Sequence, residues 1–143
     1  MTVKQISVFL ENKPGRLADF TEILSRHQID MRALSLAEAE DFGIVRIIVD
    51  DVYNASTVLK DEGYVFSITK VLAVEMPDEP GALSGIIRVL GENDVNVEYM
   101  YAFTTRKKGS AYMILRVADN KKAIEVLQKK GIRPVCQEEL ADL

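Results

Sequence analysis

Two short stretches of this chain carry residue types that could bind a small charged molecule. Residues 12–17 read Asn-Lys-Pro-Gly-Arg-Leu, and residues 78–83 read Asp-Glu-Pro-Gly-Ala-Leu. A glycine at the start of a helix lets a ligand approach the backbone, and the N–H groups of the first helical turn attract an anion such as a carboxylate. Asp30 and Asn96 follow the two stretches at the same distance and offer oxygen acceptors. An acceptor and an anion site together are what the ammonium and carboxylate of a free α-amino acid require.

A purely structural interpretation of the same residues remains open. Pro-Gly is a common way to begin a helix, and Asp or Asn before a strand is a common turn residue. A duplication copies structural features as readily as functional ones. The two stretches alone therefore leave both a binding site and a plain turn as explanations.

The chain repeats itself. Pro14 and Pro80 are 66 residues apart, close to half of the 143 residues, and Phe20 and Leu24 line up at that spacing with an isoleucine and a leucine. Two copies of a motif indicate a tandem domain and not a solenoid. Each half is near the size at which a lone core is marginal, so we expect the halves to pack on each other or on another chain.

Hydrophobic periodicity predicts which elements position the two stretches. Alternating apolar residues predict strands, and apolar residues three and four apart predict helices. In the first half we expect strands at residues 3–10, 28–37, 44–49 and 64–68, and helices at 14–27 and 52–59. In the second half we expect strands at 69–76, 95–104, 110–117 and 132–137, and helices around 83–90 and 123–127. This order predicts an α+β fold of two ferredoxin-like βαββαβ units, residues 1–68 and 69–143, each an antiparallel sheet with both helices on one face.

Composition narrows the classes of function. The formal net charge of −4 argues against a nucleic-acid partner, and 48% hydrophobic residues can fill a core. No apolar run approaches the roughly 18 residues of a membrane span, and no signal-peptide core follows Met1, so we expect a cytoplasmic protein without a membrane partner. The single histidine, His27, and the single cysteine, Cys136, leave little for metal, cofactor or acid–base chemistry. We therefore expect no enzyme, no metal and no cofactor, and we expect His27 to end a helix.

The sequence resembles a tandem of ACT domains, which are small regulatory modules that bind amino acids. The resemblance covers essentially the whole chain and rests on residues 11–17 followed by 27–31, and on residues 78–83 followed by 93–97. It implies that a ligand lies at an interface between two ACT units, between the loop after the first strand of one unit and the start of the second strand of its neighbour. The implied binding residues are Asn12, Gly15, Arg16, Leu17, Asp30 and Met31 in the first unit, and Asp78, Gly81, Ala82, Leu83, Asn96 and Val97 in the second.

Two departures from the family pattern shape the expected function. Many members are fused to an enzyme or a DNA-binding domain, and here no residues are left for one, so we expect a sensor that acts on a separate protein. The first half has Asn12 and Asp30 where the second half has Asp78 and Asn96. The two sites therefore need not be equal in their affinity for a ligand. We expect a non-catalytic homodimer that binds a free amino acid. The alternative is an interaction module that assembles without a ligand.

Overall fold

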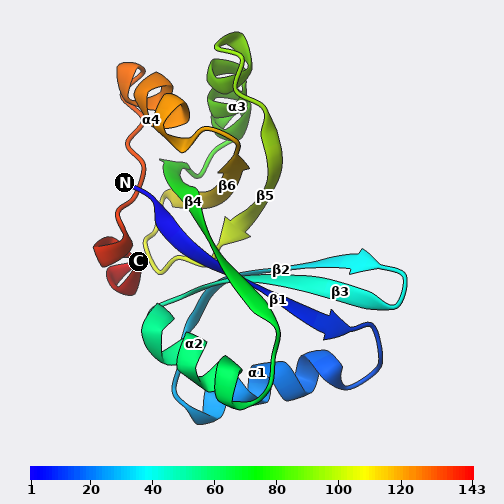
Figure 1. Cartoon of the computed structure of the whole chain (residues 1–143). Helices are drawn as coiled ribbons and strands as arrows, with labels where there is room; N and C mark the ends of the chain where they lie inside the picture. The colour runs from blue at the N-terminus through cyan, green and yellow to red at the C-terminus, as the bar shows by residue number, and fades with distance from the viewer. The chain divides into compact units, whose positions relative to one another are not determined.

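The computed structural model of the chain (Figure 1) describes residues 1–38 and 40–143, and residue 39 only as the last residue of a strand. Strands β1 to β6, helices α1 to α4 and one 3-10 helix, η1, follow each other along the chain. In chain order they are β1 (Val3–Glu11), α1 (Arg16–Arg26), β2 (Met31–Ala39), β3 (Phe42–Val49), α2 (Val52–Asp61), β4 (Phe66–Pro77), α3 (Ala82–Glu92), β5 (Val97–Phe103), β6 (Ser110–Val117), α4 (Asn120–Lys129) and η1 (Gln137–Asp142).

These elements form two compact units. We call Lys4–Thr69 the N-terminal unit, and Met1–Val3 together with Lys70–Leu143 the C-terminal unit. The division of the family's two domains at residues 68 and 69 stays a prediction. No helix within the described residues is long and apolar enough to cross a membrane.

The N-terminal unit is built on an antiparallel sheet in which β3 lies between β1 and β2. Ile6 pairs with Ile47 across β1 and β3, and Leu36 pairs with Val45 across β2 and β3. Because side chains alternate along a strand, one face of the sheet is continuously apolar, and α1 and α2 pack against it. The buried side chains of this core are Ile6, Val8, Leu10, Phe20, Ile23, Leu24, Ile29, Val45, Ile47, Val49, Ala55, Val58 and Leu59.

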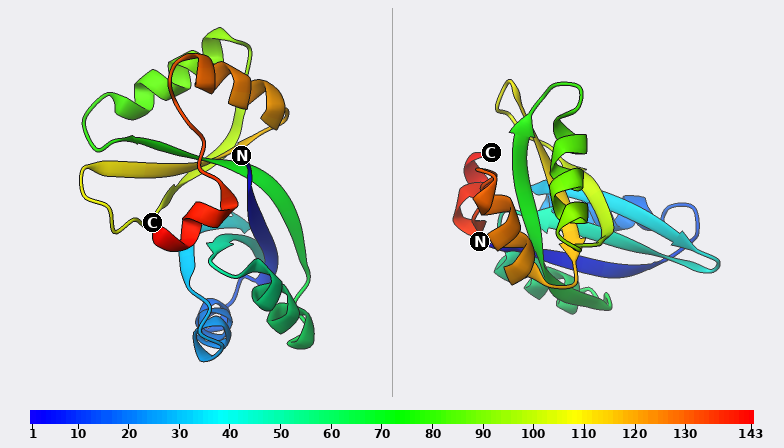
Figure 2. Two further views of the ribbon diagram at one scale, coloured as in Figure 1. Left: turned by 90° about the vertical axis from the view of Figure 1, so that its left-hand side faces the viewer. Right: turned by 90° about the horizontal axis from the view of Figure 1, so that it is seen from above.

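The C-terminal unit repeats this arrangement with β6 between β5 and β4. Leu115 of β6 pairs with Leu72 of β4 and with Met100 of β5. Helices α3 and α4 cover one face of the sheet, and η1 lies on the other side of it (Figure 2). The core consists of Leu72, Val74, Met76, Ile86, Leu90, Val95, Leu115, Val117, Ala123 and Leu127. The predicted fold class, two ferredoxin-like units with antiparallel sheets and helices on one face, is thus confirmed.

Two details of the strand prediction were wrong. The strands expected at 64–68 and 69–76 are one continuous strand, β4. The closing strand expected at 132–137 does not form: only an isolated bridge joins Val74 and Pro134 before η1 begins. Pro134 has no N–H to donate to a ladder. Glu139 then turns the chain, because its carboxylate accepts the Cys136 N–H at 2.6 Å and holds Arg133 in a bidentate pair at 2.9 Å.

Candidate functional site

The loop between β1 and α1 is shaped by Gly15. Pro14 was expected in the first helical turn, but it lies in the turn before the helix, and Gly15 is the N-cap with φ 86° and ψ −17°. A residue with a Cβ rarely adopts this left-handed conformation. Gly15 supplies no side chain to cap the helix. The Arg16 N–H donates to the Lys13 carbonyl, so the first-turn N–H groups of α1 left to other acceptors are those of Leu17 and Ala18, as an anion site requires.

The second loop has the same backbone geometry. Gly81 is the N-cap of α3 with φ 88° and ψ −14°. The Ala82 N–H donates to the Glu79 carbonyl at 3.3 Å, matching the bond from Arg16 to Lys13 at 3.3 Å. The two Pro-Gly stretches thus fold alike, down to the hydrogen bond that closes the turn.

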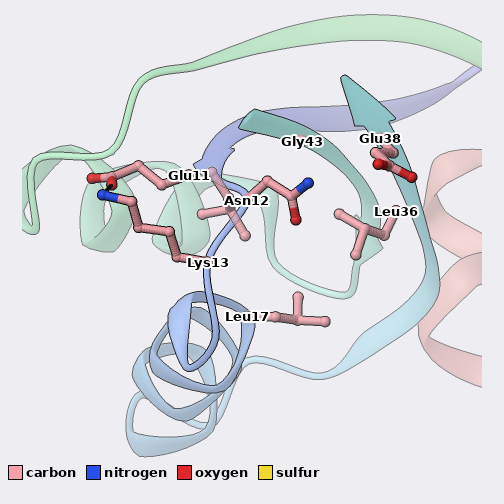
Figure 3. Close-up of a pocket in the computed structure, with 8 residues that line it drawn as sticks. Glu11, Asn12, Lys13, Leu17, Leu36, Glu38 and Gly43 are labelled. Atoms are coloured by element: carbon pink, nitrogen blue, oxygen red, sulfur yellow. Dashed lines mark ion pairs between the residues drawn. The ribbon is translucent and has the colours of Figure 1, made fainter. Parts of the chain in front are cut away.

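A cavity of about 360 Å³ lies beside the first loop (Figure 3). Two predicted site residues, Asn12 and Leu17, line it. The other lining residues are Leu10, Glu11 and Lys13 from the end of β1 and the loop, Leu36 and Glu38 from β2, and Gly43 from β3. None of Leu36, Glu38 and Gly43 was among the site residues predicted from the sequence. The antiparallel order could have indicated them, because it puts the β2–β3 turn at the same end of the sheet as the loop.

The polar groups around this cavity fall on two sides. Glu11 and Lys13 form an ion pair of 2.9 Å and point away from Leu36 and Glu38 (Figure 3). The hydrogen bond from Lys13 lowers the pKa of the Glu11 carboxyl, and the charges of Lys13 and Arg16 lower it further. On the other side the Asn12 amide donates to the Glu40 carbonyl at 3.4 Å. Glu38 and Asn12 are thus the polar side chains that face Leu36.

Asp30 and Met31 lie at the opposite end of the same sheet. They line a separate cavity of about 390 Å³ with Ile29 and residues of the α1 end. Asp30 and Glu38 are eight residues apart along the chain, a span of about 26 Å at the 3.3 Å per residue of a strand. The Asp30 carboxylate forms an ion pair with the buried Arg32 at 3.1 Å. The backbone N–H of Asp30 donates to Asp50 Oδ1 at 3.0 Å. Within the N-terminal unit, the loop and Asp30 are therefore not brought together.

The remaining predicted residues are similarly dispersed. Arg16 lines another cavity, of about 340 Å³, next to Tyr64. In the C-terminal unit Asn96 lines a cavity of about 280 Å³ at the start of β5. Asp78 and Leu83 are exposed or half-exposed on the loop and helix that surround Gly81, whereas Ala82 and Val97 pack against the core.

The residues that could suggest catalysis have structural partners. His27 caps the end of α1, with Nδ1 2.9 Å from the Ile23 carbonyl, and its counterpart Asn93 donates to the Val89 carbonyl at 2.8 Å. The expectation that His27 ends a helix is confirmed. Cys136 is half-buried at the start of η1. In the described part of the chain, no three His, Cys, Asp or Glu side chains are placed to hold a metal ion.

Comparison with known proteins agrees with this architecture. A family model described as an ACT domain pair matches residues 1–143. A crystal structure of a protein from Bacteroides thetaiotaomicron is 40% identical with a TM-score of 0.92, covering 100% of this chain and 98% of that one. The regulatory subunit of aspartate kinase from Thermus thermophilus, in a ligand-free form, shares the fold at 12% identity and a TM-score of 0.62, covering 88% and 90%.

Aspartate kinase from Clostridium acetobutylicum, described as an allosteric enzyme, has a TM-score of 0.52 at 12% identity. That match covers 88% of this chain and 32% of the kinase chain, so the shared fold is one part of a larger enzyme. No curated protein matches the chain.

Proposed function

This chain belongs to the ACT domain pair family, and we propose that it is a non-catalytic regulatory protein that binds a free amino acid at its Pro-Gly loops. The observation that carries the proposal is the cavity beside the first loop, where the first turn of α1, the polar side chains of Asn12 and Glu38, and an apolar wall meet. Solved proteins of the same fold include a kinase regulatory subunit and an allosteric kinase, which supports a regulatory role.

The cavity provides a complement for each part of an α-amino acid. The N-terminus of α1, where no side chain caps the N–H groups of Leu17 and Ala18 and the dipole end is positive, suits the carboxylate. The Glu38 carboxylate and the Asn12 amide oxygen suit the ammonium. Leu10, Leu17 and Leu36 are left for the side chain. A zwitterion can therefore be bound with both of its charges matched.

Within this proposal the ligand links two chains. Asp30 and Asn96 lie away from the loops of their own units, so we assign the family's second contact, from the start of a second strand, to a second copy of the chain. Ligand binding would then tighten a homodimer, and that change would be sensed by a separate regulated protein.

An interaction module that needs no ligand is the second candidate. It is favoured by an exposed aromatic pair on the N-terminal unit: Phe9 and Phe42 are 45% and 46% exposed, with ring centroids 6.1 Å apart. Exposed apolar patches commonly mark protein interfaces. This candidate predicts self-association that no amino acid changes.

Thermal unfolding against each of the twenty amino acids separates the two candidates. A ligand at about 100 times its dissociation constant adds about 2.7 kcal/mol of stability, which raises the midpoint by roughly 5–10 °C. A rise with one amino acid or a few would support the sensor. No rise with any of them would favour the interaction module.

Glycine variants then connect binding to the loops. Gly15→Val and Gly81→Val place a side chain at a backbone φ of 86° and 88°. We expect each variant to abolish binding at its own loop, so the ligand-induced rise disappears when both glycines are replaced. Gly131→Val is the matched control, because Gly131 has φ 74° and, like the loop glycines, no atom within 4 Å of an added Cβ. It shares the backbone strain but lies outside the loops, so its ligand-induced rise should remain. Loss of the rise in all three variants would contradict binding at the loops.

A further inference from the structure

One wall of the cavity beside the first loop is apolar. Leu10 is 6% exposed, Leu17 is half-buried, and Leu36 is 52% exposed even though its position pairs with Val45 on the core face of the sheet. An exposed leucine on that face lines open space instead of packing under a helix. In Figure 3 the side chains of Leu17 and Leu36 both border the cavity.

Gly43 allows Leu36 to form this wall. Gly43 pairs with Leu10 of β1 and with Glu38 of β2, and Leu36 lies two residues before Glu38 on the same face of β2. A methyl group at position 43 would lie 3.1 Å from Leu36 Cδ1 and 3.2 Å from the Ala37 carbonyl oxygen, which is closer than ordinary van der Waals contact. Any larger residue there would push Leu36 outward into the cavity. The glycine thus sets the depth of the apolar wall.

The second loop does not repeat the wall. Met76 of β4 pairs with Ala111, so Ala111 takes the place that Gly43 has in the first repeat. Ala102 pairs with Met113, two residues further along β6, and so takes the place of Leu36. The two loops have the same backbone geometry, but only the first lies beside a leucine, Leu36, whose side chain packs next to a glycine, Gly43.

We infer that the cavity beside Pro14–Gly15 selects a free amino acid with an apolar side chain, and that the loop at Pro80–Gly81 does not share this selectivity. The inference rests on the proposed function, whose loop chemistry recognises the ammonium and carboxylate common to all amino acids. The leucine wall adds the discrimination among side chains. A polar side chain placed there would lose water without gaining a hydrogen-bond partner, and each methylene in such a pocket changes affinity by about tenfold or more.

Calorimetric titration of the full chain tests this. The ligands are leucine, phenylalanine, serine, lysine and aspartate, each titrated separately. We expect leucine or phenylalanine to bind at least about tenfold more tightly than serine, at one site per chain. Gly15→Val should remove this site, and Gly81→Val should leave it in place.

Two leucine variants on one strand sharpen the test. Leu36→Ala should weaken binding of the preferred apolar amino acid about tenfold. Leu34→Ala is the matched control, because Leu34 lies two residues away on the same face and is 40% exposed, but does not line the cavity; it should leave affinity unchanged. Both side chains are substantially exposed, so both variants are expected to fold.

The outcomes distinguish this inference from the function on which it rests. A preference for serine, lysine or aspartate, or equal effects of Leu36→Ala and Leu34→Ala, would overturn the apolar selectivity while leaving an amino-acid sensor in place. Binding of no amino acid at all would overturn both.

Discussion

Gly15→Ala is expected to destabilise the protein, whereas a change from glycine to alanine inside helix α3 is expected to stabilise it. An added Cβ at Gly15 meets no atom within 4 Å, so the cost is backbone strain at φ 86° alone. The left-handed conformation costs an alanine about 1–2 kcal/mol. Reduced freedom of the unfolded chain offsets about 0.5 kcal/mol of this. We therefore expect a net loss of about 1 kcal/mol in the free energy of unfolding.

Gly85→Ala provides the contrasting variant. Gly85 lies exposed within α3, and its added Cβ also meets no atom within 4 Å. Alanine in a helix interior is favoured over glycine by about 1 kcal/mol, so this variant should be stabilised by that amount. Urea unfolding followed by far-UV circular dichroism suits both, since the chain has no tryptophan. The transition midpoints should move in opposite directions at an unchanged slope. Midpoints that move the same way would refute the conformational role assigned to Gly15.

Three further predictions concern stability. Asp51→Ala and Asp119→Ala each remove a helix cap whose Oδ1 accepts a backbone N–H at 3.0 Å; each should cost about 1 kcal/mol in urea unfolding, and a cost in only one would contradict equivalent caps. Phe20→Ala leaves a cavity at a fully buried position beside Tyr64 and should lower the free energy of unfolding by about 3–5 kcal/mol in the same assay. A loss of less than about 1 kcal/mol would contradict a packed core at this position. The hydrogen bonds from Arg133 and then from the Cys136 N–H lower the pKa of Glu139 from 4.5 to about 2, so its contribution to stability is present above pH 4.5 and is lost as the pH falls towards 2. Because the Glu139 side chain is 39% exposed, solvent screening limits this contribution to about 1 kcal/mol. In Glu139→Gln the free energy of unfolding should therefore fall less steeply between pH 5 and 2.5 than in the unchanged protein.

The local features of the fold were accessible from the sequence. The strands and helices around Phe20 and its counterpart were predicted because periodicity is a property of neighbouring residues. Gly63 and Gly131 follow the ends of α2 and α4 with positive φ, a position where glycine is common after a helix. The start of α1 was misplaced because a Pro-Gly step fits either the first helical turn or the turn before it.

The prediction of a closing strand at residues 132–137 was wrong for a reason that lies outside the local sequence. A strand forms only if a neighbour accepts it along its length, and Pro134 limits that pairing to a single bridge. The ion pair between Arg133 and Glu139, six residues apart, then favours the turn into η1. Periodicity shows neither the partner strand nor this side-chain pair.

The sequence by itself determined that the chain is a duplicated α+β protein, that a helix follows each of its two Pro-Gly loops, and that the chain resembles ACT domains. Only the tertiary structure decided what surrounds each loop. Leu36, Glu38 and Gly43 reach the first loop through the register of β1, β3 and β2, whereas Asp30 is carried to the far end of the same sheet. The physical reason is that helix and strand formation depend on nearby residues, while a binding cavity depends on which distant residues the pairing of strands brings side by side.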